Sequence, residues 1–355
     1  MQISPEWQPA IDEILAEPGI AVVVGAPDSG KTTFCLQLLN AAVRSDVPAA
    51  IVDSDIGQSD IGPPGTIGLA HIHEQVEELD RLTPQKLYFV GSTTPVSHLM
   101  PTVVGTKRLV DRAQSQGAKL IVVDTTGLVR GIIGRRLKTF KIDLLQPRYL
   151  VGIQMSNEVE YLFNTFSKNE GLSIHQLKTT SDAVRKPQQY RATRRRAMFY
   201  QTFNTAEGHI LRMDEIVCRN TFFGTGRPVQ WRYVKEMEGI LNQKLLHAES
   251  IGRGLYIVTE GQPDTRSTNT LMERYNTREI SIVPASAFQN ILLGLSDSSG
   301  MCMDVGLLQA VDFKQRYMFV LSKIKTMSPV KIVQFGSMRV KPDGTELGTI
   351  RAGEI

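Results

Sequence analysis

Residues 20–33 of the chain read IAVVVGAPDSGKTT, an apolar run that leads directly into a glycine-rich loop. The run of β-branched residues predicts a buried strand, and the segment from Lys31 to about Arg44 predicts the helix that follows the loop. The loop contains the spacing G-x-x-x-x-G-K-[ST] of a phosphate-binding loop (P-loop), between the strand and the helix that this motif requires. The sequence therefore predicts that a nucleoside triphosphate binds here.

The residue types of the P-loop suit a triphosphate that carries Mg²⁺. Glycines let backbone N–H groups curl around phosphate oxygens, and the helix N-terminus adds partial positive charge. Lys31 can reach the β- and γ-phosphates, and the hydroxyl of Thr32 can ligate Mg²⁺. The predicted nucleotide contacts are Gly25, Asp28, Ser29, Gly30, Lys31, Thr32 and Thr33.

Strands and helices alternate after this loop, which predicts right-handed crossovers and a parallel sheet with helices on both faces. Ligands of such a sheet bind beyond the carboxyl ends of its strands. The predicted strands are 49–53, 86–91, 118–127 and 149–153, and the predicted helices are 10–17, 98–117 and 134–147. For helix 134–147 we expect a buried side made of Leu137, Phe140, Ile142, Leu144 and Leu145.

The character of the sequence changes near residue 205. Short β-rich segments such as GLYIVTEG, REISIVP and YMFVLSKI follow, with turn residues between them, and KPDGTELG predicts a hairpin turn. We therefore expect an α/β fold of the P-loop NTPase type over residues 1–205, followed by a smaller β-rich domain over 206–355, as a β-barrel or β-sandwich.

Composition narrows the class of protein. The chain has 355 residues, 41% of them hydrophobic, and a net charge of +4, which fits a globular protein of two domains. Its three cysteines, Cys35, Cys218 and Cys302, have neither disulfide-framework nor zinc-site spacing, so a reducing cytoplasm is the expected location. The N-terminus does not resemble a signal peptide, and no apolar run has the length of a membrane span, so we expect no membrane partner.

Carboxylates follow two of the predicted strands, in DSDIGQSDIGPPGT (53–66) and DTTG (124–127). Asp55 lies where a loop would bring it towards the γ-phosphate and the Mg²⁺, so it is the candidate base that orients an acceptor hydroxyl. Asp124 is placed to hold Mg²⁺ through water. Asp53, at the strand end, is expected to be structural, and Asp60 to be solvated or near the substrate. A solvated loop charge is the alternative for each of them.

DTTG also resembles the Asp-x-x-Gly of GTPases, which senses the γ-phosphate. The guanine-reading motif [NT]-K-x-D does not follow it, since TKRL (106–109) fails at its last position and precedes DTTG. A GTPase is therefore disfavoured, whereas a P-loop ATPase that acts as a switch or assembly factor stays open.

A basic segment, VRKPQQYRATRRRAMFYQTF (184–203), supplies arginines that can neutralise phosphate charge. If it is helical from about Gln188, Arg191 and Arg195 lie on one face, one turn apart. We expect a lid over about residues 180–200 that closes on the phosphates or binds a polyphosphate backbone. A solvated basic helix face is the alternative.

With these parts assembled, residues from about 20 to 205 resemble the polynucleotide 5′-hydroxyl kinase family, which includes the kinase subunit of the pre-mRNA cleavage complex, rRNA-processing kinases and smaller prokaryotic relatives. DSDIGQSDIGPPGT is similar to the family signature D-x-D-x-G-Q…P-G-T, which is more specific than a P-loop. TTGLVRGIIG resembles its T-x-G-x-x-x-G motif, and YRATRRRAMFYQTF resembles its lid helix.

The resemblance implies that ATP and Mg²⁺ are used to phosphorylate the 5′-hydroxyl end of RNA, DNA or both. It implies catalytic roles for Lys31, Asp55, Arg191 and Arg195, and metal ligands among Thr32, Asp55 and Asp124. The implied substrate contacts are Gln58, Thr125, Gly127, Leu128 and Arg130. Leu128 stands where animal members carry a tryptophan that clamps the terminal base, so we expect no aromatic stacking on that base here. Because only a short segment precedes the P-loop, we expect no N-terminal β-domain like that of larger eukaryotic members.

Overall fold

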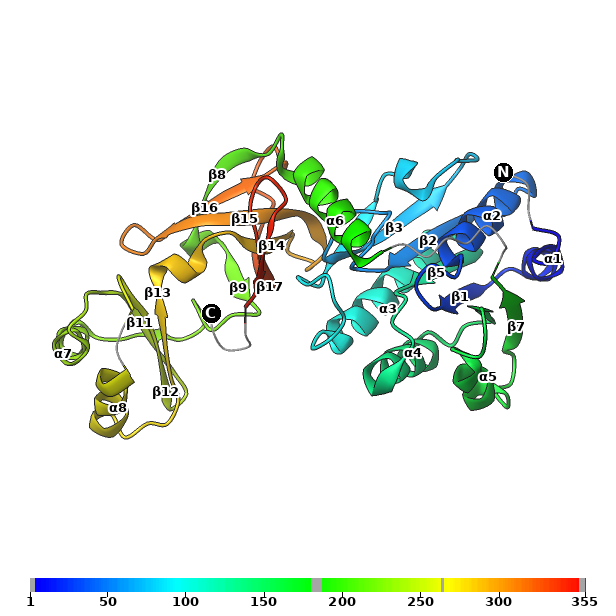
Figure 1. The fold of residues 1–355 in the computed structure, drawn as a ribbon. Coiled ribbons are helices and arrows are strands. Elements are labelled where there is room, and N and C mark those ends of the chain that lie inside the picture. Colours follow the sequence, from blue (N-terminus) through cyan, green and yellow to red (C-terminus); the bar gives the residue numbers. More distant parts are fainter. Residues whose placement is uncertain (1–3, 180–186, 263–264, 351–354) are drawn as a thin grey trace. The chain divides into compact units, whose positions relative to one another are not determined.

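The computed structural model describes residues 4–179, 187–262, 265–350 and 355. The chain forms two compact units, Met1–Arg195 and Arg196–Ile355, and the division falls within helix α6 (Gln188–Phe203). Figure 1 shows the elements of both units. The domain boundary near residue 205 stays a prediction.

The first unit is built on parallel strands in the order β2-β5-β1-β6-β7, as the alternation of strands and helices predicted. Two antiparallel strands, β3 and β4, extend the sheet beside β2, so it is not wholly parallel. The reason is local, since β2 reaches β3 through the carboxylate-rich loop without a crossover helix. The strands are β1 (Ile20–Gly25), β2 (Ala49–Ser54), β3 (Thr66–Ile72), β4 (Lys86–Phe89), β5 (Leu120–Thr125), β6 (Tyr149–Gln154) and β7 (Ser173–Lys178).

Helices cover both faces of this sheet, with α1 and α2 on one face and α3, α4 and α5 on the other (Figure 1). A mainly aliphatic core, which also contains Trp7, lies between α1 and α2 and the sheet. The Trp7 indole packs edge-on against Phe34 and donates to the backbone oxygen of Lys178 at 3.0 Å. The helices are α1 (Gln8–Ala16), α2 (Lys31–Arg44), α3 (Leu99–Ser115), α4 (Gly131–Leu145) and α5 (Glu160–Phe166), with a 3₁₀ turn at Leu79–Arg81.

Helix α4 differs from its prediction in where it begins and in which side is buried. It starts at Gly131 rather than at residue 134, and Phe140 and Leu144 are exposed by 53% and 43%. Lys138 and Lys141 are wholly buried instead. They belong to the same helical stripe as Leu137, Ile142 and Leu145, which is the stripe that faces the sheet.

The second unit is rich in β-strands, as predicted, and it contains two sheets. The larger has the antiparallel order β8-β16-β15-β14-β17-β18, with β9 parallel to β17, and the hairpin predicted at KPDGTELG joins β17 to β18. Its strands are β8 (Glu207–Arg212), β9 (Val217–Arg219), β14 (Ile291–Ser296), β15 (Cys302–Asp312), β16 (Tyr317–Ser322), β17 (Ile332–Val340) and β18 (Glu346–Thr349), with 3₁₀ turns at Met213–Glu215 and Ala285–Phe288.

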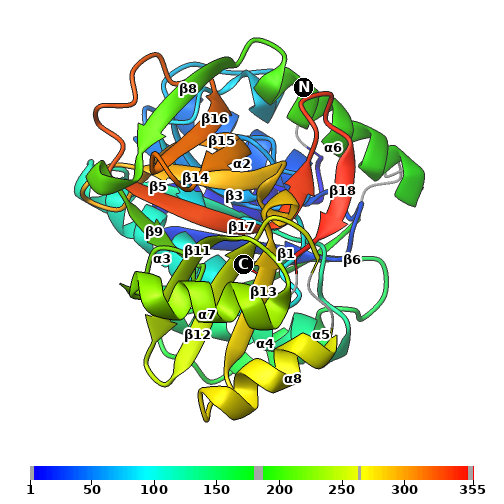
Figure 2. The same cartoon turned by 90° about the vertical axis from the view of Figure 1, so that its left-hand side faces the viewer.

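The smaller sheet has the order β10-β11-β12-β13, and helices α7 and α8 pack on it (Figure 2). The expectation of a barrel or sandwich of strands alone missed these two helices. The elements are β10 (Arg227–Pro228), β11 (Leu245–Ile251), β12 (Gly254–Thr259), β13 (Ile280–Pro284), α7 (Trp231–Leu241) and α8 (Thr265–Arg274).

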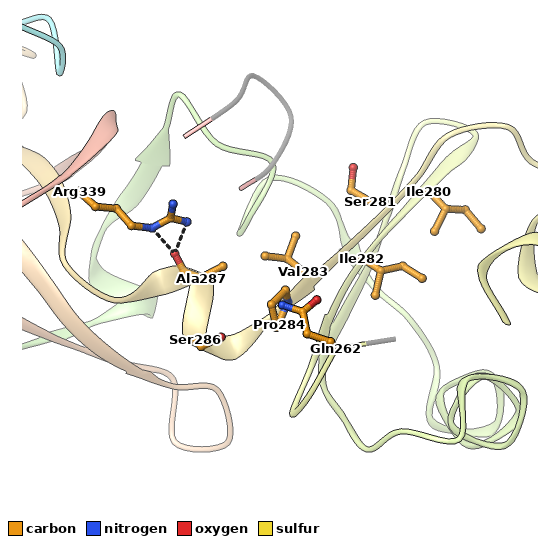
Figure 3. Close-up of a pocket in the computed structure, with 9 residues that line it drawn as sticks. All are labelled: Gln262, Ile280, Ser281, Ile282, Val283, Pro284, Ser286, Ala287 and Arg339. Carbon is orange, nitrogen blue, oxygen red and sulfur yellow. Dashed lines mark hydrogen bonds between the residues drawn. The ribbon is translucent and has the colours of Figure 1, made fainter. Parts of the chain in front are cut away.

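A cavity of about 580 Å³ lies beside β13 in this unit. Figure 3 shows its lining, in which the guanidinium of Arg339 donates to the backbone oxygen of Ala287 at 2.9 Å. Across the described ranges, no helix combines the length and apolar character needed to cross a membrane.

Candidate active site

The P-loop connects β1 to α2 and has the backbone geometry that phosphate binding requires. Gly30 has φ = +94° and Asp28 has φ = +62°, both in the left-handed region. A Cβ on Gly25 would lie 2.4 Å from the backbone oxygen of Ile153, so only glycine fits there. The ammonium of Lys31 donates to the backbone oxygen of Ala26 at 2.8 Å, which holds it over the loop. The backbone of the loop is thus tightly packed at Gly25 and left-handed at Asp28 and Gly30, and the ammonium of Lys31 lies over it.

A hydroxyl and a carboxylate meet at the start of α2. The hydroxyl of Thr32 donates to Oδ2 of Asp124 at 2.7 Å, and Oδ1 of the same carboxylate is buried without a hydrogen-bond partner in the described part of the chain. Burial raises the pKa of Asp124 to about 6, although Lys31 and Thr32 oppose this shift. The Thr32 hydroxyl and the Asp124 carboxylate thus place hard oxygen ligands side by side, and Oδ1 of Asp124 is unpaired. Such oxygen ligands fit a Mg²⁺ ion.

Few protein ligands would hold such an ion. Among the residues that the structure describes, no group of three or more His, Cys, Asp and Glu side chains is arranged around a metal site. Mg²⁺ is commonly bound through one or two carboxylates, with water and substrate phosphates completing its shell. The pair Thr32 and Asp124 suits that mode of binding, with Asp55 as the further expected carboxylate.

The carboxylate-rich loop after β2 is organised around Asp53. This side chain is 2% exposed and accepts hydrogen bonds from the backbone N–H groups of Asp55, Asp60 and Ile61, at 3.0, 2.6 and 3.0 Å. It also accepts one from the hydroxyl of Ser59 at 3.0 Å. Burial raises the pKa of Asp53 well above its usual range, and the neighbouring carboxylates of Asp60, Asp124 and Asp55 add to the shift. Asp53 therefore shapes the loop, as expected of a strand-end residue.

Asp55 projects from this loop. Its Oδ1 accepts hydrogen bonds from the backbone N–H groups of Gly57 and Gln58, at 3.2 and 3.1 Å, which orients the carboxylate. Its side chain is only partly buried. A carboxylate held in this way at the end of β2 is available to a group that approaches from outside the sheet.

The first turns of α6 contact both loops. The guanidinium of Arg191 pairs with Asp28 of the P-loop at 2.5 Å, and the Gln58 carboxamide donates to the backbone oxygen of Arg191 at 3.3 Å. Arg194 pairs with Asp60, whose side chain is only 16% exposed. Of the two expectations for Asp60, the solvated one is therefore wrong, because this ion pair covers the carboxylate, and a place near the substrate stays a prediction. Arg195 follows on the same helix, and the lid residues 180–186 lie outside the described residues.

The loop between β5 and α4 lies on the P-loop. A Cβ on Gly127 would come within 2.7 Å of the backbone nitrogen of Pro27, so this contact requires glycine. The side chain of Thr125 is fully buried, and its hydroxyl donates to the backbone oxygen of Val23 at 2.7 Å. Leu128 is half-buried and Arg130 is exposed. Thr125 thus supports this loop from below, while Arg130 is open to a ligand.

Arg130 also lines a cavity of about 450 Å³ between the start of α4 and α5. The guanidinium of Arg135 lies over the ring of Tyr161 there, 4.4 Å from its centroid. The other polar side chains of the lining are two carboxamides, Asn157 and Asn164, and two carboxylates, Glu158 and Glu160. Guanidinium groups, carboxamides and an aromatic ring are groups that bind nucleic acid, whereas the two carboxylates repel its phosphates.

Sequence reasoning missed the two buried lysines of α4. The Lys138 ammonium donates to the hydroxyl of Thr125 at 2.8 Å and to the backbone oxygen of Thr126 at 2.5 Å. The Lys141 ammonium donates to the hydroxyl of Ser54 at 2.8 Å. The one available signal was the helical period, since both residues are in register with Leu137 and Leu145.

Comparison with known proteins places this site in a family. Residues 25–205 match the family model described as mRNA cleavage and polyadenylation factor CLP1 P-loop. A protein of Pyrococcus horikoshii named polyribonucleotide 5′-hydroxyl-kinase is 29% identical over 336 residues, which cover 95% of this chain and 90% of the relative. One of the same name from Methanocaldococcus jannaschii is 28% identical over 336 residues, covering 94% and 90%.

The similarity to animal proteins is more local. A Gallus gallus protein named polyribonucleotide 5′-hydroxyl-kinase Clp1 is 37% identical over 122 residues, covering 31% of this chain and 28% of that protein. Among solved structures, the one titled "Structure of wild-type Clp1p-Pcf11p (454 -563) complex" matches with a TM-score of 0.59 and 14% identity. It covers 93% of this chain and 77% of the other, which supports the α/β fold with its β-rich second part.

Proposed function

This chain belongs to the mRNA cleavage and polyadenylation factor CLP1 P-loop family, and on that premise we propose that it is an ATP-dependent polynucleotide 5′-hydroxyl kinase. Relatives that span nearly its whole length are named polyribonucleotide 5′-hydroxyl-kinases, which favours RNA as the acceptor, with DNA as the second candidate. The observation that carries the proposal is the position of Arg191. Its side chain contacts the P-loop at Asp28 and its backbone contacts Gln58, so the lid helix joins the nucleotide loop to the carboxylate-rich loop.

The reaction is an in-line phosphoryl transfer. The 5′-oxygen of the acceptor forms a bond to the γ-phosphorus of ATP, the bond from that phosphorus to the β–γ bridging oxygen breaks, and ADP leaves. The proton of the 5′-hydroxyl goes to the carboxylate of Asp55. The backbone hydrogen bonds from Gly57 and Gln58 fix that carboxylate, which supports its role as the orienting base.

Nucleotide binding rests on the P-loop. Its residues from Gly25 to Thr33 surround the β- and γ-phosphates, and Lys31 balances their charge. Mg²⁺, when bound, would supply positive charge that offsets the charge on the phosphates. Thr32, Asp124 and Asp55 would hold it, and the unpaired Oδ1 of Asp124 supports this assignment. Arg191 and Arg195 act as the lid cations that stabilise the transferred phosphoryl group.

The acceptor end lies between the carboxylate-rich loop and the loop after β5. Gln58, Gly127, Leu128 and Arg130 contact it, while Thr125 holds the loop in place from beneath. Leu128 offers no aromatic face, so the terminal base lacks a stacking contact that is worth about 1–3 kcal/mol. We therefore expect weak discrimination among terminal bases.

End-labelling tests the proposal. The chain is incubated with γ-labelled ATP, Mg²⁺ and short RNA or DNA oligonucleotides that carry a 5′-hydroxyl, and the same oligonucleotides with a 5′-phosphate are the control. We expect label only on the 5′-hydroxyl ends, and an Asp55→Asn variant that binds ATP but transfers little. ATP hydrolysis without labelled oligonucleotide would reject the kinase in favour of a P-loop ATPase switch.

The reducing cytoplasm is the proposed site of this reaction. Cys35, Cys218 and Cys302 are all free and buried, which supports a compartment where thiols stay reduced.

A further inference from the structure

Two lysines on successive turns of α4 lie behind the carboxylates of the active site. Lys138 and Lys141 are both fully buried, although lysine is almost never fully buried unless it is paired. Neither forms an ion pair within 4 Å in the described part of the chain, and their hydrogen bonds go to hydroxyl and backbone oxygens. Packing alone therefore does not explain why two lysines are buried at these positions.

Lys138 holds the loop that follows β5. Its ammonium donates to the Thr125 hydroxyl and the Thr126 backbone oxygen, and it lies 3.4 Å from the Thr126 hydroxyl. The Thr125 hydroxyl in turn donates to Val23 of β1. One lysine thus connects α4 to the segment that leads into Gly127, Leu128 and Arg130.

Lys141 holds the point where β2 and β5 end. Its ammonium donates to the Ser54 hydroxyl at 2.8 Å, and that hydroxyl donates to the backbone oxygen of Asp124 at 2.6 Å. Ser54 directly precedes Asp55. The chain Lys141–Ser54–Asp124 therefore links the residue before the proposed base to the proposed magnesium ligand.

The pKa values of the two lysines are shifted by their burial and by the carboxylates of the site. Burial lowers the pKa of both lysines, and the carboxylates of Asp55, Asp53 and Asp124 oppose that effect at Lys141. Burying an ammonium group that has no ion-pair partner costs free energy, so packing alone does not require lysine here. Ionisable groups with strongly shifted pKa values cluster at functional sites.

We propose that Lys138 and Lys141 are positioning residues for phosphoryl transfer. Lys138 fixes the acceptor-binding loop through Thr125 and Thr126, and Lys141 fixes Asp55 and Asp124 through Ser54. The inference rests on the proposed kinase function. It predicts two separate kinetic effects, because the two lysines hold different loops.

The test uses the full chain with Lys138→Met, Lys141→Met and, as the matched control, Arg136→Met on the exposed side of α4. We expect Lys141→Met to lower kcat at least tenfold with the KM for ATP changed less than threefold. Lys138→Met should mainly raise the KM for the oligonucleotide. Arg136→Met should resemble the wild type. Thermal unfolding of each variant, followed by circular dichroism, shows whether lost activity is lost folding.

A double variant separates positioning from packing. If Lys141 acts through Ser54, Ser54→Ala together with Lys141→Met should be no worse than Lys141→Met alone, whereas independent effects would multiply. If Lys138→Met does not fold, Lys138→Gln, which keeps an N–H donor without the charge, takes its place. Wild-type kinetics in the lysine variants, multiplying effects, or a loss of Tm that accounts for the lost activity would overturn the inference.

The kinase function and the positioning roles can fail separately. A wild-type chain that hydrolyses ATP but labels no oligonucleotide rejects the kinase proposal alone. The role of Lys141 is then tested by comparing the kcat of ATP hydrolysis of Lys141→Met with those of the wild type and Arg136→Met. An unchanged kcat in Lys141→Met rejects that role. Lys138 is scored by the Kd for the unlabelled oligonucleotide, and an unchanged Kd in its variant rejects that role.

Discussion

The Thr32 hydroxyl donates a 2.7 Å hydrogen bond to one oxygen of Asp124, and the other oxygen of that carboxylate is buried with no partner among the described residues. A carboxylate in this state is costly to the folded protein when it is ionised. It is also a ready ligand for a cation that arrives with a nucleotide. Stability and function are therefore expected to oppose each other at this residue.

Asp124→Asn should stabilise the nucleotide-free protein and reduce the rise in Tm that Mg²⁺ and ATP together produce. The folded pKa of Asp124 is about 6, above its ordinary 3.8, so the ionised form lowers stability above pH 6 and this cost disappears as pH falls towards 4. At pH 7.5 we expect a gain on the order of 1–3 kcal/mol in the free energy of unfolding. The increase in Tm that Mg²⁺ and ATP give to the wild type should largely vanish.

Urea unfolding at pH 7.5 and pH 5, with and without the ligands, measures both effects. A variant that is less stable than the wild type at pH 7.5, or that keeps the full ligand-induced rise in Tm, would contradict the assignment.

Arg191→Ala should remove activity with little loss of stability. The guanidinium is expected to stabilise the transferred phosphoryl group, and arginines in that role change kcat by about 10³ or more in related reactions. Its ion pair with Asp28 is partly exposed, at 27% and 13%, so its contribution to stability is about 1 kcal/mol or less. The measurements are kcat and the free energy of unfolding.

Arg196→Ala is the matched control, because Arg196 is exposed on the same helix and pairs loosely with Asp343 at 3.5 Å. We expect near-normal activity from it. Equal losses of kcat in the two variants would favour a general charge effect of the basic helix over a lid role for Arg191.

Gly127→Ala should disturb nucleotide binding through a steric contact. The added Cβ would lie 2.7 Å from the backbone nitrogen of Pro27 in the P-loop, a distance that forces one of the loops to move. Such overpacking typically costs about 1–3 kcal/mol. We expect a raised KM for ATP and a lower Tm.

Gly239→Ala is the control for the change from glycine to alanine. Gly239 lies within α7, where a Cβ would meet nothing within 4 Å, so this variant should gain about 0.5–1 kcal/mol of stability. A Gly127→Ala protein with unchanged KM for ATP would show that the loop after β5 moves without affecting the P-loop.

The sequence predicted those parts of the molecule that local rules determine. The P-loop, the parallel strands around it and the hairpin at KPDGTELG follow from spacing, apolar runs and turn residues within a short window. The antiparallel strand β3 was missed because its residues, TIGLAHI, mix glycine and histidine with apolar residues and lie directly after a loop. Helix α8 was missed because it buries little apolar surface apart from Leu271.

The rest of the site depends on contacts between distant residues. Asp60 was expected to be solvated or near the substrate, and the ion pair that buries it was missed because its partner Arg194 lies 134 positions away. Lys141 was not among the residues expected on the buried side of α4, and its acceptor Ser54 lies 87 positions away. Burial of a charged side chain is decided by such partners, which a window of neighbouring residues does not contain.

Lys141→Met should change how stability depends on pH. The folded pKa of Lys141 is about 7, below its ordinary value of 10.5. Between these values the unfolded chain holds a proton that the folded chain has released, so this group makes wild-type stability rise with pH across that window. Below pH 7 the full cost of the buried charge is present. At pH 7 the variant should therefore be more stable, by an amount on the order of a few kcal/mol, and the gap should narrow as pH approaches 10.

Urea unfolding of wild type, Lys141→Met and Arg136→Met at pH 7, 8 and 9 gives the comparison. All other titrating groups are shared by the three proteins, so the difference between two curves isolates the substituted residue. We expect the Lys141→Met curve to converge on the wild type with rising pH and the Arg136→Met curve to run parallel to it. Three parallel curves would mean that Lys141 stays protonated in the folded protein, held by the carboxylates around it.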